Sequence, residues 1–267
     1  MKKRNLWIAL LLAALLLPGC GTTGGDKPDP ANDLEYIKNK GSLIVGVTEF
    51  APLDYKVRDE WTGFDADMAK LFAKRLGVSA QFREIEWDRK AELLESGEID
   101  VVWNGMTRTE EVEALMSCSA SYLSNSQVVV MKSESQAVFK SIEDCDKLLF
   151  ACEKGSIAKT LLTELKYRYK DYDTQQAALR AVNAQDADAA VVDRNLAAGM
   201  TGPGSTYESL TYGIPLNEEE YCVGMRKGSD LCPEVNHFFT ESGTNGVLYQ
   251  TASRYNLEHA LVTEAGK

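Results

Sequence analysis

The stretch Val101-Val102-Trp103-Asn104-Gly105-Met106-Thr107-Arg108-Thr109-Glu110-Glu111-Val112 runs from a buried strand directly into the first turn of a helix. The apolar residues at 99–103 predict the strand, and residues 109–116 predict the helix. Such a junction exposes backbone N–H groups at a helix N-terminus, where they can bind an anion. The stretch therefore indicates an α/β fold and a candidate binding site.

On both sides of this stretch, short apolar strands alternate with amphipathic helices, which is typical of an α/β protein. We expect further strands at 42–47, 81–86, 127–131, 148–152, 187–192 and 221–226. We expect further helices at 65–76, 88–96, 156–165, 174–184, 233–242 and 246–255. Asp65 and Asp88 are each expected to cap a helix, because aspartate accepts hydrogen bonds from the first free N–H groups.

The chain is acidic. Its 267 residues carry a formal net charge of −11, although the first 19 residues contain three bases and no acid. The remainder is more acidic still, which argues against binding to nucleic acid, or to anionic lipid through a basic patch. Only His237 and His259 are present and there is no C-x-x-C pair, so we expect neither a metal site nor a cofactor.

The N-terminus has the features of a targeting segment. Three bases precede an apolar run from Leu6 to Leu17, which is too short to span a membrane comfortably. Leu17-Pro18-Gly19-Cys20 is similar to the lipobox of bacterial lipoproteins. We expect a signal peptide at 1–19, and a lipidated Cys20 with a flexible tether at 20–40. The alternative is an ordinary cleaved signal peptide with an incidental cysteine; either one places the protein outside the cytoplasm.

Five further cysteines remain, at positions 118, 145, 152, 222 and 232. An oxidising compartment permits disulfides, but an odd number leaves at least one thiol free, and the sequence does not give the pairing. Cys145 and Cys152 are the closest pair in the sequence and form the candidate bridge. Buried free thiols are the alternative.

Several motifs in a fixed order resemble one family, the bacterial extracellular solute-binding proteins that capture polar amino acids for ABC importers. The resemblance extends from Gly41 to Tyr255 and depends on order and spacing, because no single motif is specific. The motifs are Gly41-Ser-Leu-Ile-Val-Gly46, Thr62-Gly-Phe-Asp-Ala-Asp-Met-Ala69, Trp87-Asp88, Ser96-Gly-Glu-Ile-Asp-Val-Val102, Gly105-Met-Thr-Arg-Thr109, Lys154-Gly-Ser156 and Asp188-Ala-Ala-Val-Val-Asp193.

The resemblance implies a periplasmic-binding-protein-like type II fold, in which two α/β lobes are joined by two crossing strands. Lobe 1 would comprise 41–127 plus 225–267, and lobe 2 would comprise 128–224. The crossings would lie at 127–131 and 221–226. The resemblance also implies a monomer that closes its lobes around a small solute, performs no reaction and delivers the solute to an ABC transporter permease.

The resemblance places one wall of the ligand site at the junction quoted above. Asn104, Gly105 and Thr107 would offer backbone N–H groups and a hydroxyl to the carboxylate of the ligand. For Thr107 the alternative is to cap the following helix, because Thr107-Arg108-Thr109-Glu110 is a capping box.

Two positions depart from the family's carboxylate site. Val112 replaces an arginine whose charge-assisted contact is worth roughly 1.5–3 kcal/mol, so a plain α-amino acid would bind about tenfold to a hundredfold more weakly. Arg108 is close in sequence but would lie on the other side of the turn. Ile157 replaces a threonine after Gly155-Ser156, so the amides of that turn remain and the third hydroxyl is lost.

The other implied site residues are acidic or aromatic. Asp193 corresponds to the acid that holds the amino group of the ligand; a local structural cap is the alternative role. Glu153 would add a second negative charge. Phe50 and Trp87 would stack on the ligand, or belong to the core. The predicted ligand-binding residues are Phe50, Trp87, Asn104, Gly105, Thr107, Glu153, Ser156, Ile157 and Asp193.

Two acids, two aromatic rings and a missing arginine favour a cationic ligand. We expect a substrate-binding lipoprotein that captures a small amine-bearing solute, either an amino acid or an amino-acid-like compound. A sensing or interaction domain with a degenerate pocket is one alternative. A dehydratase-like enzyme on the same scaffold is another, although no Ser/His/Asp or Cys/His set suggests catalysis.

Overall fold

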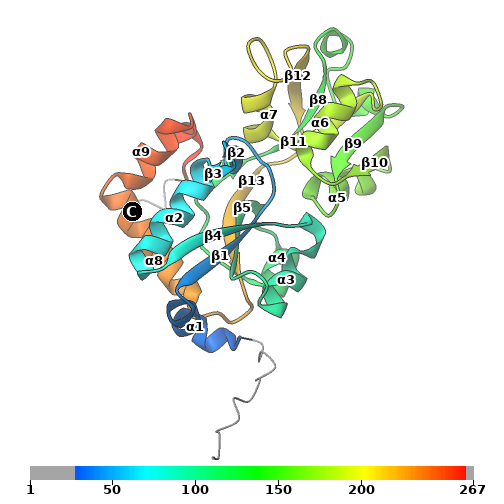
Figure 1. Cartoon of the computed structure of the whole chain (residues 1–267). Helices are drawn as coiled ribbons and strands as arrows, with labels where there is room; N and C mark the ends of the chain where they lie inside the picture. Colours follow the sequence, from blue (N-terminus) through cyan, green and yellow to red (C-terminus); the bar gives the residue numbers. More distant parts are fainter. Residues whose placement is uncertain (1–27, 263–267) are drawn as a thin grey trace, which may run out of the picture.

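The computed structural model describes residues 28–262, which form two α/β lobes, each built on its own β-sheet (Figure 1). The first sheet has the strand order β4-β1-β5-β13-β6, and β7 also pairs with β13. Its strands are β1 (Ser42–Val47), β4 (Ser79–Glu84), β5 (Val101–Thr107), β6 (Ser117–Cys118), β7 (Leu123–Asn125) and β13 (Glu219–Met225). The helices around it are α1 (Asp33–Lys40), α2 (Phe64–Leu76), α3 (Lys90–Ser96), α4 (Glu110–Leu115), α8 (Leu231–Thr244) and α9 (Val247–Arg254).

The second sheet has the strand order β10-β9-β11-β8-β12. Its strands are β8 (Gln127–Lys132), β9 (Leu149–Glu153), β10 (Arg168–Tyr172), β11 (Ala189–Asp193) and β12 (Leu210–Pro215). The helices of this lobe are α5 (Ile157–Glu164), α6 (Gln175–Asn183) and α7 (Arg194–Met200). A separate hairpin, β2 (Tyr55–Val57) and β3 (Glu60–Thr62), lies beside the first sheet.

The central strands are apolar because helices cover both faces of each sheet. Nearly every side chain of β1, β5 and β11 is buried, as expected of parallel strands packed between helices. Trp103 of β5 is fully buried and packs with Phe72 of α2 and with Phe238 and Phe239 of α8. The stretch that decides the fold therefore forms the centre of the first lobe.

The chain passes between the two sheets twice, first between β7 and β8 and later between β12 and β13. We expected the second crossing at 221–226. The structure instead pairs β13 with β5, β6 and β7, so this strand belongs to the first sheet and the passage lies earlier, at 216–218. The first crossing was expected at 127–131, but β8 pairs with β11 and β12 in the second sheet, so that passage lies at Ser126. An apolar pattern shows that a strand is buried but does not show which of two sheets it joins.

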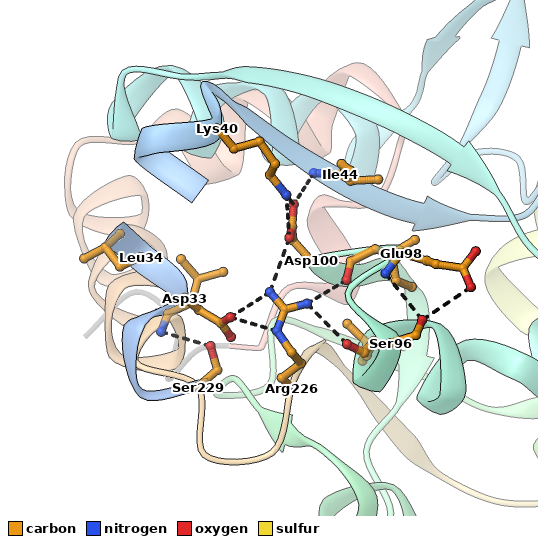
Figure 2. Close-up of polar contacts among 12 residues, drawn as sticks. Asp33, Leu34, Lys40, Ile44, Ser96, Glu98, Asp100, Arg226 and Ser229 are labelled. Atoms are coloured by element: carbon orange, nitrogen blue, oxygen red, sulfur yellow. Dashed lines mark hydrogen bonds and ion pairs between the residues drawn. The ribbon is translucent and has the colours of Figure 1, made fainter. Parts of the chain in front are cut away.

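The residues before β1 are folded, in contrast to the flexible tether predicted as far as residue 40. Pro30–Asn32 form a 3-10 turn and α1 follows. Asp33 is completely buried and forms an ion pair with Arg226 (Figure 2). The prediction is therefore wrong for residues 30–40, because a buried ion pair holds this helix in place. The predicted signal peptide and Cys20 lie outside the described residues.

Both predicted aspartate caps are wrong. Helix α2 begins at Phe64 after Gly63, and Asp65 makes no capping bond there. Its carboxylate accepts hydrogen bonds from the Gly105 N–H and the Tyr122 hydroxyl, both at 2.7 Å. Asp88 lies in a 3-10 turn before α3. A nearby tertiary donor outcompetes the helix terminus for a buried carboxylate, and the sequence pattern does not reveal such donors.

The five cysteines after residue 27 are all free thiols, so the predicted Cys145–Cys152 bridge is wrong. Both residues lie in the apolar core of the second lobe. Burial raises the pKa of the Cys145 thiol to about 11 and that of Cys152 to about 12. Within residues 28–262, no helix is long and apolar enough to cross a membrane.

Candidate functional site

A cavity of about 220 Å³ lies between the two lobes. All nine residues predicted to bind the ligand line it: Phe50, Trp87, Asn104, Gly105, Thr107, Glu153, Ser156, Ile157 and Asp193. The first five come from the first lobe and the last four from the second. The topology explains this convergence, because Thr107, Glu153 and Asp193 each end a strand and Ser156 follows just beyond one.

Polar groups of the three residues predicted to face a carboxylate are already bound to acidic side chains of the protein. The three bonds are Gly105 N to Asp65 Oδ2 (2.7 Å), Asn104 Nδ2 to Asp54 Oδ2 (2.7 Å) and Thr107 Oγ1 to Glu219 Oε1 (3.1 Å). Burial raises the pKa of Asp65 to about 7, and burial together with Asp65 raises the pKa of Asp54 well above its usual value. These groups therefore fix the shape of the turn.

Gly105 allows the Phe50 ring to pack against this turn. Its φ is +57°, in the left-handed region that favours glycine. A Cβ at this position would lie 2.5 Å from Phe50 Cε1 and 2.7 Å from Leu53 Cδ1. Phe50 is itself only 3% exposed and makes an edge-to-face contact with Tyr221. The ring of Phe50 therefore belongs both to the core and to the cavity wall.

Asp193 places a buried carboxylate on the wall formed by the second lobe. It precedes α7 but makes no capping bond through its side chain. Its oxygens accept hydrogen bonds from the side chains of Asn125, Gln127, Gln175 and Tyr221. Burial and the neighbouring Glu219 raise the pKa of Asp193 well above its usual value. Among the described residues only Gln175 donates to Oδ2, which leaves this oxygen able to accept a further bond.

Glu153 is the second acid of this wall. It ends β9, is 3% exposed, and burial raises its pKa to about 8, although Lys90 and Gln175 act in the opposite direction. Within the described part of the chain, its Oε1 has no hydrogen-bond partner. A buried carboxyl oxygen without a partner is unfavourable by about 1–3 kcal/mol. A ligand that donates a hydrogen bond at this point would remove that penalty.

Lys90 also lines the cavity, and the sequence analysis missed it. Its Nζ donates to the Trp87 carbonyl at 3.1 Å and lies 4.5 Å from the centroid of the Trp87 ring. Burial lowers its pKa, while Glu153 and Asp88 act to raise it. The sequence places Lys90 three residues after Trp87, and residues three apart at a helix start share a face. That spacing could have identified Lys90 as a cavity residue.

The two departures from the family pattern both lie at the cavity wall, since Val112 and Ile157 line it. Arg108 is not among the lining residues and forms an ion pair with Glu113. Helix α4 is capped by Thr109, whose Oγ1 accepts a hydrogen bond from the Val112 N–H at 3.1 Å. The alternative role of Thr107 as the helix cap is therefore wrong.

The lobes touch each other beside the cavity. Lys154 Nζ lies 3.0 Å from Asp88 Oδ2, which joins the second lobe to the first. Gly155 has a φ of +71°, and a Cβ there would lie 2.6 Å from the Cβ of Asp88. Ser156 follows and caps α5, because its Oγ accepts a bond from the Lys159 N–H. The close approach at Gly155 brings the first turn of α5 to the edge of the cavity.

Sequence reasoning also missed the polar residues around Asp193. Asn125 and Gln127 flank the first passage between the sheets, and Gln175 lies in the first turn of α6. Glu219 accepts bonds from Thr107, Asn125 and Gln127, and so links both lobes. The available signal was the polar character of Gln127 at the start of an otherwise apolar strand.

Comparisons with known proteins give a consistent result. Residues 43–258 match the bacterial extracellular solute-binding proteins, family 3. The arginine-binding extracellular protein ArtP of Bacillus subtilis is 25% identical over 96% of this chain and 98% of its own length. The ABC transporter glutamine-binding protein GlnH of the same organism is 28% identical, over 91% of this chain and 92% of its own length.

A crystal structure of a mutant of ArgBP from T. maritima superposes with a TM-score of 0.78 at 27% identity. The match covers 84% of this chain and 98% of that one. The two-lobed architecture of this chain is therefore that of the type II periplasmic amino-acid-binding proteins.

Proposed function

This chain belongs to the bacterial extracellular solute-binding proteins, family 3, and on that premise we propose that it captures a small amine-bearing solute by closure of its two lobes. The solute is an amino acid or an amino-acid-like compound. The observation that carries the proposal is the pair of buried carboxyl groups, Glu153 and Asp193, on one wall of the cavity. An ammonium group supplies both the charge and the hydrogen bonds that such groups need. Trp87 and Phe50 on the other wall can add about 1–2 kcal/mol.

The same proposal includes delivery of the solute to an ABC transporter permease by a monomer anchored through a lipid on Cys20. The relatives support the importer role, because GlnH is named as a component of an ABC transporter. The lipobox-like sequence before Cys20 supports the anchor. Residues 20–29 would then connect the folded part to the membrane over at most roughly 35 Å. The family and these relatives are named for binding, which favours a binding protein over a dehydratase-like enzyme.

The proposal is tested by a thermal-shift screen of the purified chain against amino acids and small amines. A true ligand at a hundredfold excess over its Kd stabilises the protein by about 2.7 kcal/mol, because it binds only the folded state. Trp87→Ala should abolish or strongly reduce the shift. Tyr249→Ala is the matched control, since Tyr249 is 59% exposed and does not line the cavity. Absence of any stabilising compound would refute the proposal.

A second prediction concerns the departure at position 112. Val112→Arg adds a guanidinium at the cavity wall and should tighten the binding of an α-amino acid by about tenfold to a hundredfold. Val57→Arg serves as the control, because Val57 is exposed on the β2–β3 hairpin. Isothermal titration gives both Kd values. If Val112→Arg folds normally and affinity is unchanged, the carboxylate of the ligand does not lie beside α4.

A further inference from the structure

A basic group and two acidic groups face the cavity from opposite lobes. Lys90 lines it from the first lobe, and Glu153 and Asp193 line it from the second. Glu153 Oε1 has no hydrogen-bond partner, so Lys90 does not bond to it, and no ion pair joins the two residues within the described chain. A base and a buried acid that are held apart in one cavity each lack a full set of partners. A ligand that carries both an anionic and a cationic group would supply a partner to each.

Lys90 has the donors needed for an anion. An ammonium has three N–H groups, and one of them is bound to the Trp87 carbonyl at 3.1 Å. The nearby Asp88 is paired with Lys154. The Trp87 ring lies 4.5 Å from Nζ and stabilises the charge from one side. The other side of the ammonium remains available to a group in the cavity.

Other donors of the first lobe are committed elsewhere. The Gly105 N–H, the Asn104 amide and the Thr107 hydroxyl each donate to an acidic side chain of the protein. Lys90 is the only base among the described residues that line the cavity. The N-terminal end of α5, at 155–157, lines the same cavity, and the helix dipole there also favours an anion. Two features of the cavity lining therefore favour a negative group.

We propose that Lys90 binds the carboxylate of the solute while Glu153 and Asp193 bind its ammonium group. This inference rests on the proposed function and names the residue that recognises the carboxylate. Lys90 would then take the role that an arginine at position 112 has in the family, where this chain has Val112. Trp87 then has two roles, because it holds Lys90 through its carbonyl and ring and also lines the cavity.

The test compares each amino acid with the amine that remains when its carboxylate is removed. Isothermal titration of the purified full chain uses the twenty standard amino acids and L-ornithine. For the tightest binder, the matching amine follows: agmatine for L-arginine, putrescine for L-ornithine, or histamine for L-histidine. The unmodified protein should bind the amino acid about tenfold to a hundredfold more tightly than its amine.

Three variants identify the group that recognises the carboxylate. Lys90→Met keeps the length of the side chain and removes its charge, so the affinity ratio between amino acid and amine should fall to nearly one. Lys90→Arg should keep the preference. Lys56→Met is the matched control, because Lys56 also lies over a tryptophan ring, at 4.8 Å from Trp61, and is outside the cavity lining. A purely structural role for Lys90 would weaken both ligands equally and leave the ratio unchanged.

The outcomes separate this inference from the proposed function. If the unmodified protein binds an amine as tightly as its amino acid, or Lys90→Met leaves the ratio unchanged, the inference is wrong and the binding function stands. If no amino acid or amine binds the unmodified protein, the proposed function fails and the inference fails with it.

Discussion

Replacing Arg226 with methionine should lower the free energy of unfolding by about 3–5 kcal/mol, because the change leaves buried charges without a partner. Arg226 is 2% exposed, and its guanidinium contacts Asp33 at 2.7 Å and Asp100 at 3.3 Å, both completely buried (Figure 2). It also donates to the carbonyls of Leu94 and Ile99. Lys40 pairs with Asp100, and Arg226 is the only base paired with Asp33 among the described residues, so Asp33 would lose its cation.

The measurement is the urea unfolding midpoint at an unchanged m-value. Arg254→Met is the matched control: Arg254 pairs with Asp67 at 3.1 Å but is 58% exposed, so its loss should cost less than about 1 kcal/mol. Asp33→Asn introduced into the Arg226→Met variant should restore part of the stability, because it removes a buried charge. Similar midpoints for the two arginine variants would mean that the network contributes no more than a surface pair.

This network also explains why the N-terminal helix was not predicted. Asp33 and Arg226 are separated by 193 positions, and neither residue has a local pattern that indicates the other. The sequence before residue 41 is rich in polar residues, so it was taken as a tether. The contact anchors α1 to the end of β13, whose other end carries Glu219 near the cavity. Long-range pairing of charges is the information that a single sequence lacks.

The apolar strands, by contrast, were predictable because burial on both faces leaves an unbroken hydrophobic run. β1, β9 and β11 were all expected close to their observed bounds. β5 was expected at 99–103 but runs from 101 to 107, because its polar end at 104–107 also pairs in the sheet. β10 and β12 were missed. β10 (Arg168–Tyr172) lies at the edge of its sheet and consists of charged and aromatic residues. It therefore has no unbroken hydrophobic run. Edge strands are stabilised by pairing with a neighbour, which the sequence of the strand alone does not show.

Most of the predicted cavity residues lie at strand ends or helix starts within recognisable motifs, whereas Asn104 and Gly105 lie inside β5. The residues that were missed contact predicted ones: Gln175 bonds to Asp193, Glu219 bonds to Thr107, and Lys90 packs on Trp87. Polar groups at 104–107 were expected to face the ligand, and in the structure they bond to acidic side chains of the protein. The sequence shows which side chains can donate or accept hydrogen bonds, whereas the partner of each side chain depends on the packed structure.

The ligand-free protein should lose stability as the pH rises from about 5 to 8, and Glu153→Gln should remove part of this loss. Burial raises the pKa of Glu153 to about 8, so the folded protein keeps this proton up to that pH. The unfolded chain releases it near its ordinary value of about 4.3. Between these values unfolding releases a proton, so stability falls by about 1.4 kcal/mol for each pH unit from this group.

The measurement is a set of urea unfolding curves from pH 5 to 8 for the unmodified protein and the variant. Asp65 has a pKa of about 7 and adds a similar loss at lower pH, so the difference between the two proteins isolates Glu153. This difference should grow up to about pH 8 and then become constant. Parallel curves would show that Glu153 is ionised in the folded state throughout, with a cation or water as its partner.

Ligand binding should also change the protonation of Glu153. An ammonium group beside Glu153 stabilises the carboxylate and therefore lowers its pKa, so binding at pH 7 should release up to one proton. Titrations in two buffers of different ionisation enthalpy measure this number directly. Glu153→Gln should release fewer protons on binding, because Asp193 alone remains beside the ammonium, whereas Glu220→Gln, a change outside the cavity lining, should leave the release unchanged. If both variants release the same number of protons, the amine does not lie beside Glu153, because only a neighbouring cation would lower the pKa of that buried carboxyl.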